Sequence, residues 1–366
     1  MWIVWVWLAA HQSNRIEALG RYSETYAWFV GAAGLCALAA TWLLRPARLG
    51  LLRWPAVAAL AGSALLALLT AEAAVRALDL FGTSYYEETS RYLSDTEPDG
   101  LLGYRHRAGR EETYQGVAVE INGSGLRERE LDGGYGRRVL LLGDSVTFGW
   151  GVEAEETFGR RLEEIFPGLE TVNAGVCGYN TVQQLRYLET EGLALEPDAL
   201  FVLFTENDVQ PAIEIARDST APAIREGASL PLAFLLRHSW LYRLGYHATA
   251  NPPVTPPADL DRARQESFQA LDRIARLSER EGVPLAVFFY RLYRTPVGDR
   301  IWQDIATLAI GRGFTAADTL PWFDGLNLDE LTNSFVDPHP NPRAHRILAA
   351  GMADTLTTPE TARNRH

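Results

Sequence analysis

The sequence predicts a parallel α/β domain preceded by an N-terminal membrane region. Two observations carry this prediction. The first eighty residues contain long uncharged apolar stretches, whereas the remainder has the composition of a soluble domain. From Arg138 onward, short apolar runs alternate with helical segments, which is the pattern of successive βαβ units. At 366 residues the chain is long enough to hold both parts.

Residues 1–80 are predicted to form the membrane region. Residues 26–44 and 54–70 carry no charge, and we expect membrane helices over about 26–44 and 54–72. The apolar residues 2–10 are too short to cross, because such a helix reaches about 14 Å against a hydrocarbon core of about 30 Å. They are either the end of a further membrane helix or an interfacial segment. Two buried helices of a soluble protein are the alternative for the longer stretches.

The loop between the two expected helices sets the orientation. Residues 45–53 hold three arginines and no acid, which predicts a cytoplasmic loop. The second helix then leads out of the cytoplasm. We therefore expect an integral protein of the inner (cytoplasmic) membrane whose main domain lies on the extracytoplasmic side.

Three segments are expected after the membrane region. Residues 81–136 are polar, with short strand-like pieces such as 117–121, and are interpreted as an irregular connector that packs on the catalytic domain. Residues 137–358 form that domain, and 359–366 a tail. Within the domain we expect strands at 139–142, 171–174, 199–204, 284–290 and 313–317, and helices at about 155–166, 181–192 and 260–281, with a last helix ending near 356. Residues 230–246 fit an amphipathic helix, either packed on the core or serving as a lid.

Composition narrows the chemistry. The net charge of −12 argues against a nucleic-acid partner. Because no lysine occurs, a Schiff-base mechanism is excluded and histidine is left as the general base at neutral pH. Cys36 and Cys177 lie too far apart for a zinc site of the usual spacing. We expect neither a metal nor a cofactor.

Polar residues gather where the expected strands end. Gly143-Asp144-Ser145, the stretch 173–178, Asn207-Asp208 and Asp337-Pro338-His339 follow strands or lie in a late loop. The carboxyl ends of parallel strands converge on one edge of the sheet. A hydroxyl nucleophile needs a base, a group that orients the base, and donors for the developing oxyanion. The residue types therefore predict a serine hydrolase.

The four stretches resemble the SGNH (GDSL-type) hydrolase family over roughly residues 143–356. The family blocks named for Ser, Gly, Asn and His correspond to Ser145, Gly178, Asn207 and His339 in order and spacing. Leu102-Gly103-Tyr104 and residues 122–127 also look like the lead-in of membrane-anchored members. The resemblance implies a flavodoxin-like three-layer α/β/α fold.

The resemblance also implies site roles. Ser145 would be the nucleophile, His339 its base and Asp337 the group that orients the base. The Ser145 and Gly178 N–H groups and the Asn207 side chain would bind the oxyanion, with Asp144 and Asp208 in support.

Two features depart from the family pattern. Asp337 lies two residues before His339 rather than three, and Glu206 replaces the usual glycine before Asn207. In an extended segment, residues two apart point the same way, so Asp337 can still reach the imidazole.

We therefore expect a membrane-anchored serine esterase or acetyl hydrolase acting on acylated glycans or lipids of the envelope. An O-acetyltransferase of envelope polysaccharide using the same residues, and a non-catalytic glycan-binding protein, are the alternatives. The sequence identifies no protein partner.

Overall fold

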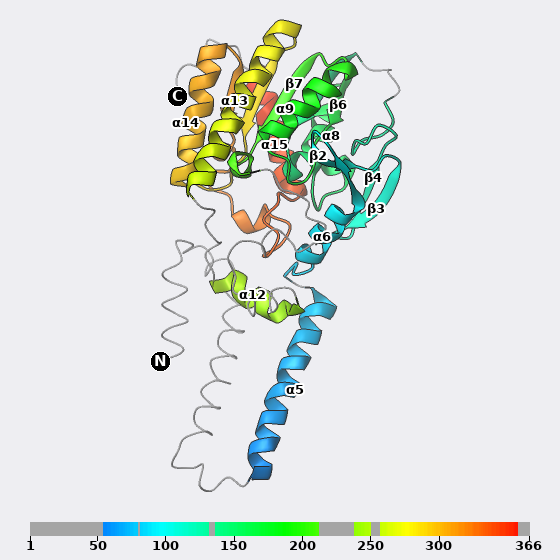
Figure 1. The fold of residues 1–366 in the computed structure, drawn as a ribbon, viewed down its shortest axis with the longest axis vertical. Helices are drawn as coiled ribbons and strands as arrows, with labels where there is room; N and C mark the ends of the chain where they lie inside the picture. The colour runs from blue at the N-terminus through cyan, green and yellow to red at the C-terminus, as the bar shows by residue number, and fades with distance from the viewer. Residues whose placement is uncertain (1–53, 80, 132–135, 212–237, 250–256, 358–366) are drawn as a thin grey trace. The chain divides into compact units, whose positions relative to one another are not determined.

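The computed structural model describes residues 54–79, 81–131, 136–211, 238–249 and 257–357 (Figure 1). The chain divides into two compact units. One comprises residues 1–84 and 224–253, and the other residues 85–223 and 254–366. The predicted division at residues 80 and 136 stays a prediction.

The larger unit is built on a five-stranded sheet whose neighbouring strands all pair in parallel. Its strand order is β6-β5-β7-β8-β9. The strands are β5 (Arg137–Leu142), β6 (Leu169–Asn173), β7 (Ala199–Phe204), β8 (Leu285–Phe289) and β9 (Thr315–Asp318). Because β6 and β7 lie on opposite sides of β5, the loops that follow β5 and β7 diverge, and ligands bind such sheets at this point. The predicted parallel α/β fold is confirmed.

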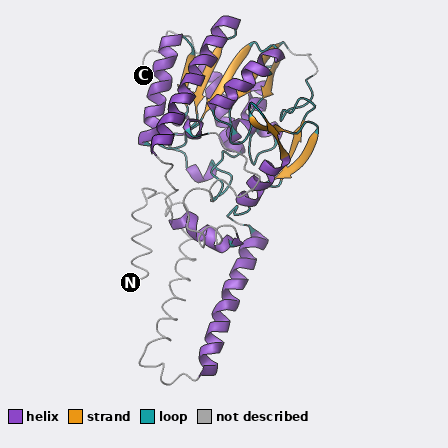
Figure 2. Ribbon diagram, viewed as in Figure 1, coloured by secondary structure: helices purple, strands orange, loops and turns teal. Residues whose placement is uncertain are grey.

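Helices cover both faces of the sheet (Figures 1 and 2). One core includes Leu140, Leu142 and Val202, packed under α9 (Thr181–Thr190), α13 (Pro257–Glu281) and α14 (Pro296–Arg312). The alternate residues Val139 and Leu141 belong to a second core under α8 (Phe158–Ile165) and α15 (Pro342–Thr357). The alternation of strand side chains thus produces three layers. Short 3-10 turns lie at Ala154–Glu156, Gly192–Leu195, Glu206–Val209, Leu320–Phe323 and Leu328–Glu330.

The segment expected to be irregular is regular over residues 85–121, which corrects that part of the prediction, and its strand-like piece 117–121 is the strand β4. It holds α6 (Tyr85–Asp95) and two antiparallel hairpins, β1–β2 (Thr96–Asp99, Gly103–His106) and β3–β4 (Arg110–Tyr114, Val117–Ile121). Tyr92 and Tyr114 are buried in one cluster with Phe148, Trp150 and Cys177 of the α/β domain. The segment gains its order from this shared aromatic core.

In the smaller unit, α5 (Trp54–Leu78) is the longest described helix. Its stretch Ala59–Leu78 is long and apolar enough to cross a membrane, and none of that window is buried. This length and composition fit a membrane anchor or a signal sequence. The second helix, α12 (Trp240–Thr249), begins on Glu72 of α5, whose carboxylate accepts hydrogen bonds from the N–H groups of Trp240 and Leu241 at 2.9 and 3.0 Å. The predicted helix 26–44, the segment 2–10 and the tail lie outside the described residues.

Candidate active site

Ser145 is the first residue of the one-turn helix α7 (Ser145–Phe148), directly after β5. Asp144 caps this helix, because its carboxylate accepts a hydrogen bond from the N–H of Val146 at 2.9 Å. The turn is packed too closely for a side chain at Gly175, where a Cβ would lie 2.2 Å from the Phe148 nitrogen. The residues Gly143 and Gly175 therefore let β5, α7 and the loop after β6 meet.

Three predicted site residues form one hydrogen-bonded chain. His339 Nε2 lies 2.8 Å from Ser145 Oγ, and His339 Nδ1 lies 2.6 Å from Asp337 Oδ1. Asp337 is fully buried, whereas the His339 side chain keeps 16% of its surface exposed. Burial lowers the pKa of His339, but the charge and hydrogen bond of Asp337 outweigh burial and raise that pKa above its ordinary value.

The second carboxylate oxygen of Asp337 is bound by Asn333, a residue that sequence reasoning missed. Asn333 Nδ2 lies 3.2 Å from Asp337 Oδ2 and also donates to the carbonyl of Trp150 at 2.9 Å. The Asn333 N–H donates to the carbonyl of His339 at 2.9 Å. Asn333 thus links the loop that carries the acid and base to the loop after α7.

The predicted residues Asn207 and Asp208 lie after β7, next to Asp144, which follows β5. Asn207 Nδ2 donates to Asp144 Oδ2 at 2.8 Å, which joins this loop to the nucleophile turn. Asp208 is fully buried and accepts hydrogen bonds from the Thr205 N–H at 2.7 Å and from Thr181 Oγ1 at 3.0 Å. Burial, with the nearby charge of Asp144, raises the pKa of Asp208.

Gly178 lies in the loop between β6 and α9 with a φ of +85°, a conformation that favours glycine. Within the described part of the chain, neither its N–H nor that of Ser145 donates to a protein acceptor. These two donors, with the second hydrogen of the Asn207 amide, are free to bind an oxygen. The preceding residue, Cys177, is buried, and burial raises the pKa of its thiol, so Cys177 is a protonated, apolar neighbour of the site.

Two aromatic rings flank the base. The ring of Tyr85 lies 5.8 Å from that of His339, centroid to centroid, and the ring of Trp150 lies 6.3 Å away. Tyr85 comes from α6 and Trp150 from the loop after α7. The segment 85–131 therefore supplies part of the surroundings of the site.

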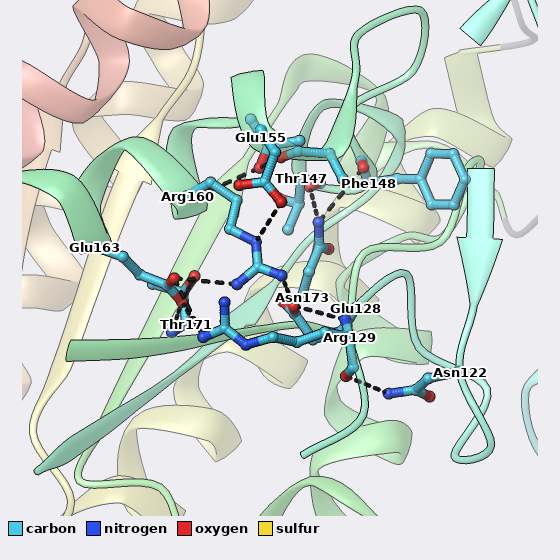
Figure 3. A network of polar contacts seen from close by, with 12 residues as sticks. Asn122, Glu128, Arg129, Thr147, Phe148, Glu155, Arg160, Glu163, Thr171 and Asn173 are labelled. Carbon is cyan, nitrogen blue, oxygen red and sulfur yellow. Dashed lines mark hydrogen bonds and ion pairs between the residues drawn. The ribbon is translucent and has the colours of Figure 1, made fainter. Parts of the chain in front are cut away.

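Polar contacts behind the site hold its loops in place (Figure 3). Asn173 Nδ2 donates to the carbonyl of Thr147 at 2.8 Å, which ties β6 to α7. The buried ion pair of Arg160 with Glu128 joins α8 to the segment before β5, and Arg160 also pairs with Glu163 within α8. Outside the figure, buried Arg127 donates to the carbonyls of Phe148 and Val152 at 2.8 and 2.6 Å, on either side of Trp150.

Two other histidines are structural. His345 is fully buried and accepts a hydrogen bond from the Phe158 N–H at 3.1 Å, and burial lowers its pKa to about 3. Burial likewise lowers the pKa of His106 to about 4. Among the described residues, no group of three or more His, Cys, Asp or Glu side chains could hold a metal ion.

A wide hollow of about 750 Å³ lies elsewhere, between α13 and α14. Four of its charged side chains are paired with each other, Arg264 with Asp304 and Arg312 with Asp272. Because Ser145 and His339 do not line it, the geometry of the hydrogen-bonded chain, rather than hollow size, locates the candidate site.

Comparison with known proteins decides the family. The model of the GDSL-like lipase/acylhydrolase family matches residues 141–347, more than half of the chain. The chain belongs to this family. As a GDSL-type protein it is a hydrolase that acts on ester bonds. The match begins in β5 and ends in α15, so it spans all the residues of the hydrogen-bonded chain described above.

Solved structures with a similar chain path include other hydrolases. A catalytic mutant of an acetylxylan esterase from Geobacillus stearothermophilus is 17% identical, with 63% of this chain and 98% of that chain covered and a TM-score of 0.40. An α/β hydrolase from the metagenome of Lake Arreo is 16% identical (60% and 95% covered, TM-score 0.40). A lipase/acylhydrolase from Enterococcus faecalis is 12% identical (60% and 95% covered, TM-score 0.38). The curated proteins gave no match.

Glu206 stands where the GDSL pattern usually has a glycine. The Glu206 carboxylate accepts a hydrogen bond from Thr295 Oγ1 at 2.7 Å, and Thr295 caps α14. A Cβ at Gly298 would lie 2.5 Å from Glu206 Oε1, so the start of α14 is fitted around this carboxylate. The glutamate thereby links the loop that carries Asn207 to α14.

Proposed function

We propose that this GDSL-type hydrolase is a serine esterase in which Ser145, His339 and Asp337 form a catalytic triad. The observation that carries the proposal is the unbroken chain Ser145 Oγ–His339 Nε2–His339 Nδ1–Asp337 Oδ1, with distances of 2.8 and 2.6 Å. Residues from the two ends of the α/β domain meet there in the order that general-base catalysis requires.

The geometry supports a definite sequence of proton transfers. Asp337 accepts a hydrogen bond from the Nδ1–H of His339, which keeps its proton, so Nε2 of the neutral imidazole is left to accept the Ser145 proton as Oγ attacks an ester carbonyl. The developing oxyanion would be bound by the N–H groups of Ser145 and Gly178 and by the Asn207 amide. The imidazolium then returns the proton to the leaving alcohol, and a water molecule repeats the cycle to release the acid.

We further propose that the enzyme is anchored in the inner membrane by α5, faces the extracytoplasmic side, and removes acyl groups from envelope glycans or lipids. The exposed apolar stretch Ala59–Leu78 supports the anchoring. The assignment of the domain to the extracytoplasmic side is based on the arginines of residues 45–53. The same acyl-enzyme would serve an O-acetyltransferase if a glycan hydroxyl replaced water, so the test includes an acceptor.

The test is hydrolysis of p-nitrophenyl acetate by the full-length protein in detergent, beside Ser145→Ala and His339→Ala. We expect turnover by the wild type and loss of about 10³-fold or more in either variant, because triad members act as a unit. An added oligosaccharide that speeds nitrophenol release and itself gains acetyl groups would identify a transferase. Equal rates in all three proteins, with folding unchanged, would disprove the triad.

A further inference from the structure

The hairpin β1–β2, which lies outside the matched family region, makes a direct contact with the loop that carries Gly178. Tyr104 of β2 is fully buried, and its hydroxyl donates a hydrogen bond to the carbonyl of Cys177 at 2.7 Å. Burial raises the pKa of Tyr104 well above its ordinary value, so this hydroxyl stays protonated and remains a donor at any working pH.

This hydrogen bond acts on the peptide group that also contains the Gly178 N–H. In a trans peptide the C=O of one residue and the N–H of the next lie in one plane and point in opposite directions. The peptide bonds of the described chain are all trans. When Tyr104 holds the Cys177 carbonyl on one side, it necessarily directs the Gly178 N–H to the other side.

Glycine makes such a tether necessary. Gly178 adopts a φ of +85°, and glycine tolerates positive and negative φ about equally. A flip of the Cys177–Gly178 peptide plane would therefore meet little steric resistance at Gly178. The small residue that leaves room for a substrate at this position does not by itself fix the direction of its N–H.

The preceding peptide plane is tethered as well. The Cys177 N–H donates to the hydroxyl of Tyr92 at 3.1 Å, and this hydroxyl lies 2.6 Å from Nε2 of His106. His106 Nδ1 lies 3.1 Å from the Gly125 carbonyl, which can only accept, so Nε2 is the acceptor for Tyr92. Both peptide planes at Cys177 are thus held by tyrosines from residues 85–131.

We propose that Tyr104 is a positioning residue for the oxyanion hole, which it serves by fixing the Cys177–Gly178 peptide plane so that the Gly178 N–H faces the reacting carbonyl. The inference rests on the proposed serine esterase mechanism. It assigns a role in catalysis to β2, which the family match does not include. A hydrogen bond to the carbonyl also polarises the peptide group and makes its N–H a stronger donor.

The test compares the full-length wild type with Tyr104→Phe, which keeps the ring and removes only the hydroxyl. Tyr114→Phe is the matched control, because Tyr114 is also buried in this segment and its hydroxyl donates to Asp95 Oδ2 at 2.8 Å, away from Cys177. We measure kcat and KM on p-nitrophenyl acetate, the inhibition constant of phenylboronic acid, whose serine adduct carries an oxygen in the oxyanion position, and thermal unfolding.

In Tyr104→Phe we expect kcat to fall about tenfold with KM unchanged, less than the 10²–10³-fold typical when an oxyanion donor is removed outright. Binding of phenylboronic acid should weaken by a similar factor. Tyr114→Phe should keep both values while losing comparable thermal stability. Active sites counted by titration with a fluorophosphonate correct kcat for any unfolded fraction.

Three outcomes are informative. Unchanged kcat and boronate binding in Tyr104→Phe, with wild-type activity abolished by Ser145→Ala, would overturn the role of Tyr104 and leave the esterase standing. Equal losses in Tyr104→Phe and Tyr114→Phe would reduce the effect to general destabilisation and overturn it as well. Activity that survives Ser145→Ala would overturn the esterase mechanism and with it this inference.

Discussion

Asp337 has both carboxylate oxygens in use, one by His339 and one by Asn333. The latter contact, at 3.2 Å, involves an asparagine that also binds the Trp150 carbonyl. A carboxylate held from two sides cannot rotate away from the imidazole, so in our account Asn333 acts on catalysis through Asp337.

We predict that Asn333→Ala lowers kcat and moves the acid limb of the pH–rate profile to higher pH. The limb of the wild type should already lie above the ordinary pKa of histidine, because Asp337 raises the pKa of His339 and activity requires the neutral imidazole. Without its Asn333 donor, Asp337 becomes a stronger base and stabilises the imidazolium further. The kcat/KM profile between pH 5 and 9 measures both shifts.

Asn341→Ala is the control for this prediction. Asn341 donates to the carbonyls of Glu330 and Thr332, and within the described part of the chain it makes no hydrogen bond to Asp337, so its loss should cost stability without moving the limb. A limb that stays in place in Asn333→Ala would show that Asn333 is merely structural.

At the scale of elements, α8 and α15 are joined by a neutral histidine. His345 of α15 accepts a hydrogen bond from the N–H of Phe158, the first residue of α8, and its ring stacks on the Phe158 ring at 5.9 Å. Because the folded pKa of His345 is about 3 and the ordinary value is 6.5, the unfolded chain takes up a proton between these values that the folded chain does not. The stability contributed by His345 is therefore full above pH 6.5 and is lost as the pH falls toward 3.

We predict that wild type loses about 2–3 kcal/mol more unfolding free energy between pH 7.5 and 4.5 than His345→Asn does, at about 1.4 kcal/mol per pH unit inside the window. Asparagine keeps an acceptor for the Phe158 N–H but does not titrate. Urea unfolding of both proteins at both pH values measures these free energies. Subtracting the change in one protein from the change in the other removes the contribution of carboxylates that both proteins contain. An unfolding free energy that changes equally with pH in the two proteins would contradict the prediction.

The strands β5, β7 and β8 were predictable because each contains a short apolar run that is followed by polar residues. The helix α14 was not, since its buried stripe is only Ile301, Ile305 and Ala309, and Pro296 and Gly298 at its start resemble a loop. The motif residues Ser145 and His339 could be found from the sequence. Asn333 belongs to no motif, and Tyr104 stood out only as part of the lead-in Leu102-Gly103-Tyr104. Their contacts join segments up to 183 residues apart in the chain, so only the fold brings them to the site.

In the whole molecule, the proposed function combines a membrane helix with an esterase domain. The side chains of Leu66 and Leu69 on α5 are each more than half exposed, which is costly in water and expected in lipid. We predict that the full chain remains in the membrane fraction after carbonate extraction with its N-terminus uncleaved. A soluble protein lacking the first eighty residues would show that α5 belongs to a signal sequence.

The matched variants Leu66→Arg/Leu69→Arg and Leu78→Arg sharpen this test. Arginine near the middle of a membrane helix costs about 2.5–3.5 kcal/mol on insertion scales and much less near its end. The double variant should therefore fail to carry the α/β domain across the membrane, and Leu78→Arg should still carry it, which protease accessibility of the domain in spheroplasts measures. Unchanged accessibility in the double variant would place α5 outside the bilayer.

The central claim is that ester cleavage passes through an acyl group on Ser145. Full-length protein is mixed with p-nitrophenyl acetate, quenched in acid within one turnover and analysed by peptide mass spectrometry. Our account predicts an acetyl group on the peptide that contains Ser145, present in wild type and absent from His339→Ala, where the attacking oxygen keeps its proton. Nitrophenol release without acetylated Ser145, or acetylation at another residue, would contradict it.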